Sequence, residues 1–121
     1  MLINLSNHPK NRWSSQQISI ANELYGEIYD LPFPAIDPKG DENYIHELAE
    51  LYLQKIINLA QNQTITVHIM GEMNFSFTLI QLLQQHNITC VASTTQRIVE
   101  ENKLGEKKAT FHFERFRKYT F

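Results

Sequence analysis

The feature that most constrains this chain is the repeated switch between short strand-like segments and longer helix-like segments. Strand-like runs of hydrophobic and β-branched residues cover residues 2–5, 28–31, 65–70 and 88–93, and helical periodicity appears between them. This order calls for right-handed crossover connections, which place the strands parallel in one sheet with helices on both faces. The sequence therefore predicts an α/β fold, a Rossmann-like three-layer sandwich with a mainly parallel sheet.

Capping residues bound the predicted helices. Ser14 or Ser15 is placed to cap the first helix, and Asp41 to cap the second, whose hydrophobic stripe runs to about residue 62. A third helix is expected over residues 75–85. Each predicted helix lies between two strand-like segments, as the crossover connections require.

The C-terminal part follows a different pattern. Residues 96–101 and 109–119 flank a turn-like segment at 102–106, and hydrophobic and polar residues alternate over 110–114. This pattern predicts a terminal antiparallel hairpin. A chain of 121 residues with 42% hydrophobic content suits one domain, so we expect a single domain over residues 1–121.

Charge and cysteine content exclude several classes of protein. A net charge of −2 disfavours a protein that coats duplex nucleic acid. The single cysteine, Cys90, excludes an internal disulfide and fits a reducing compartment. Residues 1–5 lack the features of a signal peptide, and no hydrophobic run approaches the roughly 20 residues of a membrane span. We therefore expect a cytoplasmic protein without a membrane partner.

Polar segments follow three of the predicted strands, where ligands bind in open parallel sheets. These segments are Ser6-Asn7-His8, Gly71-Glu72-Met73-Asn74 and Ser93-Thr94-Thr95. The first two precede helices, whose N-terminal N–H groups favour an anion. Gly71 either lets the backbone approach the next helix or a ligand, or serves a tight turn with positive φ.

Several of these residues have two interpretations. His8 is a candidate acid, base or phosphate donor, or a loop histidine that caps backbone groups. Glu72 is a candidate base or ribose partner, or a first-turn glutamate favoured by the helix dipole. Arg97 is a phosphate clamp or a surface residue, and the Ser93 segment is a phosphate nest or a strand-ending turn. No histidine pair has the spacing of a metal motif, so no metal is expected.

Five segments together resemble a known group of proteins. They read LINLSNHP, DLPFPAIDP, VHIMGEMNFSFTLI, CVASTTQRIVEE and FHFERFRKY, and they span nearly the whole chain. The chain resembles small stand-alone CARF-like proteins of type III CRISPR systems, several of which are ring nucleases. It departs from that pattern because no lysine follows Gly71 directly.

The resemblance implies a homodimer whose strand-end loops form one basket for a cyclic oligoadenylate. Its implied ligand-binding residues are Ser6, Asn7, Arg12, Gly71, Met73, Thr78, Ser93, Thr94, Thr95 and Arg97. The arginines in this set are the candidate phosphate cations. His8 and Glu72 are the candidate catalytic residues.

The implied reaction needs neither metal nor cofactor. A ribose 2′-hydroxyl attacks its own 3′ phosphodiester, which opens the ring, leaves a 2′,3′-cyclic phosphate and so switches off type III CRISPR signalling. Two alternatives remain. One is a binding module that sequesters the cyclic nucleotide without cleaving it. The other is an interaction subunit whose strand over residues 111–119 pairs with the sheet edge of a partner.

Overall fold

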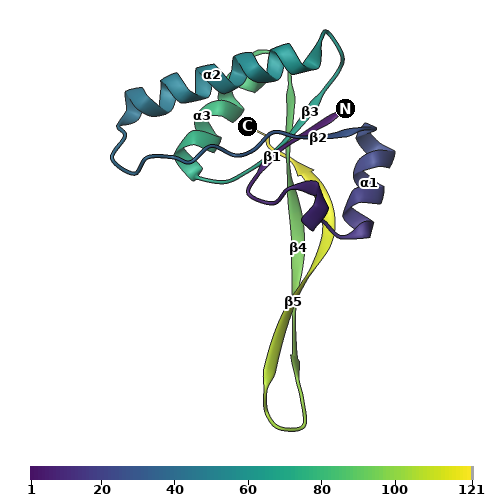
Figure 1. Cartoon of the computed structure of the whole chain (residues 1–121). Coiled ribbons are helices and arrows are strands. Elements are labelled where there is room, and N and C mark those ends of the chain that lie inside the picture. Colours follow the sequence, from purple (N-terminus) through teal and green to yellow (C-terminus); the bar gives the residue numbers. More distant parts are fainter. Residues whose placement is uncertain (121) are drawn as a thin grey trace.

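A five-stranded sheet organises the chain (Figure 1). The computed structural model describes residues 1–120. Its elements are β1 (Leu2–Ser6), the short 3-10 helix η1 (Lys10–Arg12), α1 (Ser15–Tyr25), β2 (Ile28–Asp30), α2 (Glu42–Ala60), β3 (Thr66–Met70), α3 (Met73–Gln85), β4 (Thr89–Glu101) and β5 (Lys107–Lys118). The predicted alternation of strands and helices is confirmed.

The sheet is parallel except for its last strand. Its order is β2-β1-β3-β4-β5, and only β5 runs antiparallel to its neighbour. The chain moves outward from β1 to β2 and then returns past β1 to β3, so the direction of winding reverses between β1 and β3. Ser6 pairs with Met70 at this reversal, which brings the carboxyl ends of the two strands side by side.

Helices cover both faces of the sheet (Figure 1). Side chains in β1 alternate between the two faces, and all of them are buried. Leu2 joins a hydrophobic cluster with residues of α1 and β5, whereas Ile3 and Leu5 join the cluster formed with α2 and α3. The α/β, Rossmann-like three-layer arrangement is therefore confirmed.

Side chains cap the first two helices as expected. Ser14, rather than Ser15, accepts a hydrogen bond from Gln17 N at 3.1 Å at the start of α1. Asp41 accepts one from Tyr44 N at 3.0 Å at the start of α2. These bonds satisfy N–H groups that have no partner inside the helix.

The hairpin is longer than the sequence predicts. Strands β4 and β5 pair from Val91 opposite Lys118 to Glu101 opposite Lys107, and the outer part projects away from the body (Figure 1). The terminal hairpin is confirmed, but the loop predicted at Ser93, Thr94 and Thr95 is wrong. These residues lie inside β4, because β5 continues to pair with them, with one irregularity between Thr94 and Thr95.

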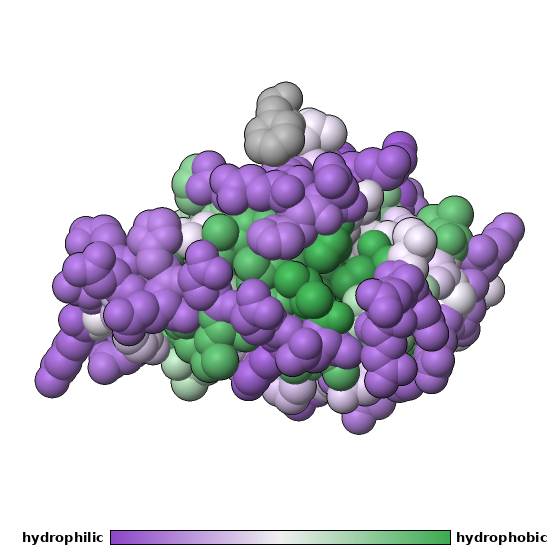
Figure 2. All heavy atoms as spheres, turned by 90° about the horizontal axis from the view of Figure 1, so that it is seen from above, coloured by the Kyte–Doolittle hydropathy of each residue, from purple (hydrophilic) through white to green (hydrophobic). Residues whose placement is uncertain are grey.

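Figure 2 shows the end of the molecule opposite the hairpin tip. Hydrophobic side chains form its centre, and hydrophilic side chains surround them. Hydrophobic side chains therefore reach the surface at this end of the molecule. Within residues 1–120, none of the helices combines the length and the hydrophobicity needed to cross a membrane.

Candidate functional site

A buried polar network around Asn4 holds the carboxyl end of β1. Asn4 is only 2% exposed, and its Nδ2 donates to Asp30 Oδ1 and to the carbonyl oxygen of His8, both at 2.9 Å. Its Oδ1 accepts from Ser6 Oγ at 2.8 Å and lies 2.9 Å from His68 Nδ1. Because the Nδ2 atom faces two acceptors, the orientation of the amide is fixed.

The network determines the protonation of His68. Asn4 Oδ1 can only accept, so His68 Nδ1 carries the proton and Nε2 accepts from Ser93 Oγ at 3.1 Å. Burial, together with a smaller contribution from nearby His8, lowers the pKa of the His68 imidazole to about 4. The ring also packs edge-on against Trp13, with centroids 5.2 Å apart. His68 is therefore neutral at pH 7 and links β1 to β4.

The polar segment after β1 is held mainly through the backbone of His8. The His8 carbonyl oxygen accepts hydrogen bonds from Asn4 Nδ2 and Trp13 Nε1, both at 2.9 Å, and lies 3.1 Å from Ser6 Oγ. The Ser6 hydroxyl is buried and used in these contacts. Asn7 and His8, in contrast, expose their side chains. Of the three residues predicted here, Asn7 and His8 are thus available to a ligand.

Basic residues follow this segment in η1. Lys10 N donates to both carboxylate oxygens of Asp30, at 3.1 and 3.3 Å, and Lys10 Nζ donates to the carbonyl oxygen of Ile28 at 3.2 Å. Arg12 is exposed in the same short helix. The predicted phosphate cation Arg12 therefore lies in the segment that also presents Asn7 and His8.

Gly71 allows a close approach between two loops. A Cβ atom at this position would collide with the ring of Phe33, which packs edge-on against Phe75 at 5.3 Å between centroids. Gly71 does not have positive φ, unlike Gly26 and Gly105. The expected turn with positive φ is therefore wrong. The close approach is confirmed, and the group approached is Phe33 rather than the next helix.

Glu72 caps helix α3. Its Oε1 accepts from Phe75 N at 2.8 Å, and its Oε2 accepts from Asn74 N at 3.1 Å. Glu72 lies at the helix start, but as its N-cap rather than in its first turn as expected. Its carboxylate already bonds two of the N–H groups that an anion would use, and its negative charge disfavours a second anion there.

The remaining predicted residues separate along β4. Ser93 Oγ lies beside His68 at the end of β3, whereas Thr94 Oγ1 donates to the carbonyl oxygen of Arg115 at 3.2 Å. Arg97 pairs with Phe111. It is roughly 13 Å further along the strand than Ser93, at about 3.3 Å per residue. Within one chain, Ser93 reaches the strand ends and Arg97 does not.

Five of the ten predicted ligand residues line three separate pockets. Ser6 and Asn7 line one of about 290 Å³, beside Asp30. Gly71 and Met73 line a second of about 430 Å³. The third, of about 440 Å³, contains Glu72, Thr78 and three further acidic residues, Asp37, Asp41 and Glu42. Four carboxylates make this third pocket unfavourable for a phosphate.

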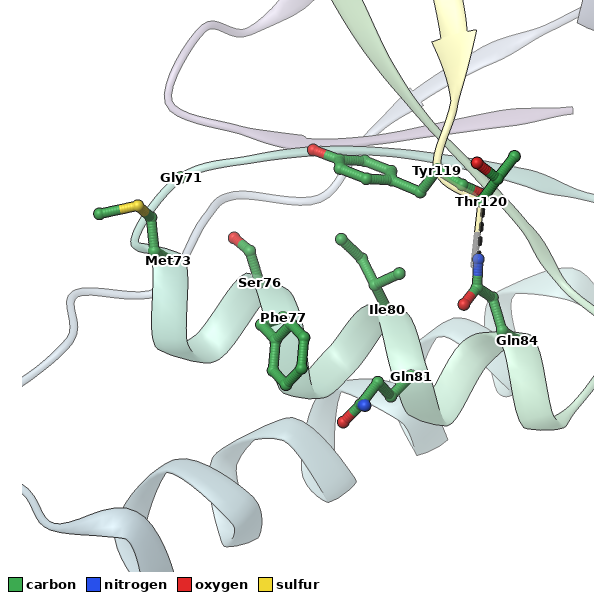
Figure 3. A pocket seen from close by; sticks show the side chains of 9 residues that line it. All are labelled: Gly71, Met73, Ser76, Phe77, Ile80, Gln81, Gln84, Tyr119 and Thr120. Carbon is green, nitrogen blue, oxygen red and sulfur yellow. Dashed lines mark hydrogen bonds between the residues drawn. The ribbon is translucent and has the colours of Figure 1, made fainter.

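The 430 Å³ pocket lies between α3 and the end of β5. Ser76 and Ile80 point from α3 toward Tyr119, and the Met73 and Phe77 side chains lie at the same helix (Figure 3). Ser76 is 8% exposed, and its hydroxyl has no hydrogen-bond partner among the described residues. An apolar pocket with one unpaired hydroxyl suits a flat apolar group that carries an acceptor.

Sequence reasoning missed Asn4 and Asp30, which organise the strand ends. The available signal was an amide in the middle of the hydrophobic run LINLS, where a buried polar side chain needs partners. Those partners come from β2 and β3. The sequence therefore showed that Asn4 needed partners but not which residues supplied them.

One family model covers almost the entire chain. It is described as the Uncharacterized protein MJ1673 family and matches residues 1–117. No curated protein is similar enough to match the chain. Because the family match includes the body and nearly all of the hairpin, the chain belongs to the Uncharacterized protein MJ1673 family.

Proposed function

We propose that this protein binds a cyclic oligoadenylate at the carboxyl edge of its sheet and cleaves it as a ring nuclease. The observation that carries the proposal is the reversal of strand order between β1 and β3, where Ser6 pairs with Met70. Ligands of open α/β sheets bind at such a reversal. Around it lie exposed Asn7 and His8 on one side and the pocket beside Gly71 on the other. The resemblance of the sequence segments to small CARF-like proteins supplies the ligand class.

The distribution of apolar, basic and acidic side chains along the sheet edge indicates where the bases and phosphates of the ligand lie. The pocket beside Gly71 and Met73 is lined mainly by apolar groups and contains the unpaired Ser76 hydroxyl, which suits an adenine base. The phosphates lie toward Arg12, Asn7 and His8, because the pocket beyond Glu72 is acidic. Bases and phosphates thus separate along the edge of the sheet.

Cleavage in this arrangement depends on positioning. The ribose 2′-oxygen attacks the adjacent phosphorus, the bond from phosphorus to the 5′-oxygen breaks, and a 2′,3′-cyclic phosphate forms. The proton released by the 2′-hydroxyl is balanced by the proton that the leaving 5′-oxygen gains. The exposed His8 imidazole is the side chain at this edge suited to proton transfer. Holding the ribose in line can lower the barrier by several kcal/mol.

A homodimer would complete the site. One chain places five of the ten predicted ligand residues in three separate pockets, and a twofold axis at the strand ends would bring residues of two copies to one ligand. A symmetric ring suits such a symmetric site. The ligand would then contact equivalent residues of both copies.

The test is incubation of the protein with cyclic tri-, tetra- and hexa-adenylate in a chelator, followed by chromatography of the products. We expect a linear oligoadenylate with a 2′,3′-cyclic phosphate from one ring size. Calorimetric titration of the same ligands measures binding. His8→Ala should slow cleavage more than it weakens binding, whereas His86→Ala, which removes an exposed histidine at the C-terminal end of α3, serves as the control.

Three results would change the proposal. Tight binding of a ring that stays intact would favour a sequestering module. Equal binding of a cyclic oligouridylate would contradict the adenine pocket. No binding of any ring, together with a protein partner that co-purifies, would favour the interaction subunit instead.

A further inference from the structure

One face of the outer hairpin carries most of its apolar side chains. We name residues 95–113 the arm. The pairs Thr95 with Phe113, Arg97 with Phe111, Val99 with Ala109 and Glu101 with Lys107 share this face, which we call the apolar face because Val99, Ala109, Phe111 and Phe113 lie on it. The opposite face carries Gln96, Ile98, Glu100, Lys108, Thr110 and His112. Four of the eight residues on the apolar face are apolar, against only Ile98 among the six on the opposite face, so the apolar side chains of the arm gather on one side.

The apolar face of the arm continues the core. Phe113 and Phe116 are each 6% exposed, and they belong to the hydrophobic cluster that contains Trp13. Phe111, the next residue on the same face, is 67% exposed, and Val99 is 49% exposed. The stripe therefore begins in the core and runs outward into solvent, where nothing in residues 1–120 covers it.

The exposed area is large enough for an interface. The chain exposes 8353 Å². A compact protein of 14.2 kDa exposes roughly 6,800 Å², which leaves an excess of roughly 1,600 Å². A standard protein interface buries about 800 Å² on each partner. An isolated two-stranded hairpin is also marginally stable in water, so the arm gains most from a covering partner.

The chain itself carries the surface that such an arm would contact. Met70, Met73 and Phe77 expose 39%, 83% and 64% of their side chains at the carboxyl edge of the sheet. The arm projects beyond this same edge (Figure 1). Residues 23–50 contain eight acidic side chains and one basic one, whereas the arm contains four basic and three acidic ones. The arm is therefore close to neutral, and charge does not oppose its contact with the acidic segment of another copy.

We propose that the arm is a clasp for a second copy of this chain. Beyond Ser93, β4 extends for eight residues to Glu101, which is roughly 26 Å at about 3.3 Å per residue. Two copies that face each other at the carboxyl edge each extend an arm over the other. The interface is isologous, so Phe111 and Val99 of both copies become buried together. This inference stands on the arm alone and does not require a nucleotide.

Analytical ultracentrifugation of the full chain, without nucleotide, tests the clasp between about 1 and 100 μM, the range in which dimers with micromolar affinity form. We expect a dimer. Phe111→Glu and Val99→Glu should each raise the dimer dissociation constant at least about tenfold, as expected for an apolar anchor. Thr110→Glu places the same charge on the opposite face and should leave the constant within about twofold. Far-UV circular dichroism confirms that each variant is folded.

Two outcomes would overturn the clasp. One is a parent chain that stays monomeric across the whole concentration range. The other is a dimer whose dissociation constant is the same with Phe111→Glu, Val99→Glu and Thr110→Glu. Failure to bind any cyclic oligoadenylate bears on the proposed function only, since the dimer is measured in the absence of nucleotide.

Discussion

The body and the arm share strands β4 and β5 but are stabilised in different ways. In the body, Val91 of β4 is 1% exposed, and β1 is buried along its whole length. In the arm, no residue from 96 to 112 is buried. The strands of the arm are held together by cross-strand pairs such as Glu100 with Lys108. One strand can therefore contribute to a core over half its length and to an exposed ribbon over the other half.

Removing a phenylalanine ring should change the free energy of unfolding much more in the body than in the arm. Phe75 is fully buried between the rings of Phe33 and Tyr52, so Phe75→Ala should lower the free energy of unfolding by about 3–5 kcal/mol. Phe111→Ala removes the same ring from the arm. It should lower the free energy of unfolding of the monomer by less than about 1 kcal/mol, because that ring is exposed. Urea unfolding at two protein concentrations measures both variants.

Concentration dependence sharpens this comparison. The loss from Phe75→Ala should be the same at both concentrations, since it arises within one chain. The loss from Phe111→Ala should grow with concentration if the arm contacts a second copy. Equal losses from the two variants would show that the arm is packed as tightly as the body.

The two regions should also differ in their response to pH. Burial lowers the pKa of His68 to about 4, whereas the value in the unfolded chain is about 6.5. Protonation therefore favours the unfolded chain. The stabilising effect of neutral His68 is complete above pH 6.5 and is lost as the pH falls toward 4. The loss is on the order of 3 kcal/mol.

Urea unfolding at pH 7 and pH 4.5 measures this loss. The parent should lose more stability over that range than His68→Gln does. His112→Gln is the matched variant in the arm, where an exposed imidazole has one 3.4 Å contact with Thr110 Oγ1. If the two variants change the pH dependence equally, His68 is not its source.

Sequence patterns predicted the order of the elements because local signals determine them. Hydrophobic periodicity located β1 to β4, and Asp41 marked the start of α2. The polar run at Ser93 has the composition of a strand-ending turn. It remains a strand because β5 supplies its pairing partners, which follow 18 to 23 residues later in the chain. Local composition could not predict that distant pairing.

The candidate site depended even more on distant contacts. The close approach at Gly71 was predicted, but its partner Phe33 comes from a loop 38 residues earlier in the chain. Asn4 and His68 meet across 64 residues. A sequence shows that a glycine or a buried amide needs a neighbour, and the fold determines which neighbour it receives.

Gly71 in the body and Gly105 in the arm are needed for different reasons. Gly71 avoids a steric clash, whereas Gly105 adopts a backbone conformation with positive φ. Gly71→Ala forces its new Cβ against the ring of Phe33 and should cost about 1–3 kcal/mol of global stability. Phe33→Leu should recover part of that cost, because the two positions are in contact. Gly105 has φ of +78° in the turn of the arm, with Glu101 Oε1 3.8 Å from the position of an added Cβ. Gly105→Ala should cost about 1 kcal/mol, confined to the arm.

Hydrogen exchange followed by mass spectrometry distinguishes these effects. Gly71→Ala should accelerate exchange in β1 and β3, and Gly105→Ala should accelerate it in β4 and β5 beyond Thr95 alone. Faster exchange throughout the body of Gly105→Ala would contradict the independence of the two regions.

The smallest change in stability is expected at two side chains that accept hydrogen bonds from nearby backbone N–H groups, one in the body and one in the arm. Glu72 accepts from Asn74 N and Phe75 N at the start of α3, and Asn102 Oδ1 accepts from Leu104 N and Glu106 N, both at 2.9 Å, at the tip of the arm. Glu72→Ala should lower global stability by about 1 kcal/mol, whereas Glu72→Gln, which keeps an acceptor, should recover most of it. Asn102→Ala should leave global stability within about 0.5 kcal/mol, because the arm contributes little to the core.

Titration with cyclic tetra-adenylate then tests whether Glu72 has a second role. If residue 72 only caps α3, the parent and Glu72→Gln should bind the ring with equal affinity, since both side chains keep the helix start in place. A carboxylate that also accepts hydrogen bonds from ribose hydroxyls or an adenine amino group should lose affinity on conversion to Gln, because charged acceptors form stronger hydrogen bonds. Reduced affinity in Glu72→Gln at unchanged stability would therefore assign Glu72 to the ligand as well as to the helix. Unchanged affinity would leave ligand recognition to the segment around Asn7 and His8.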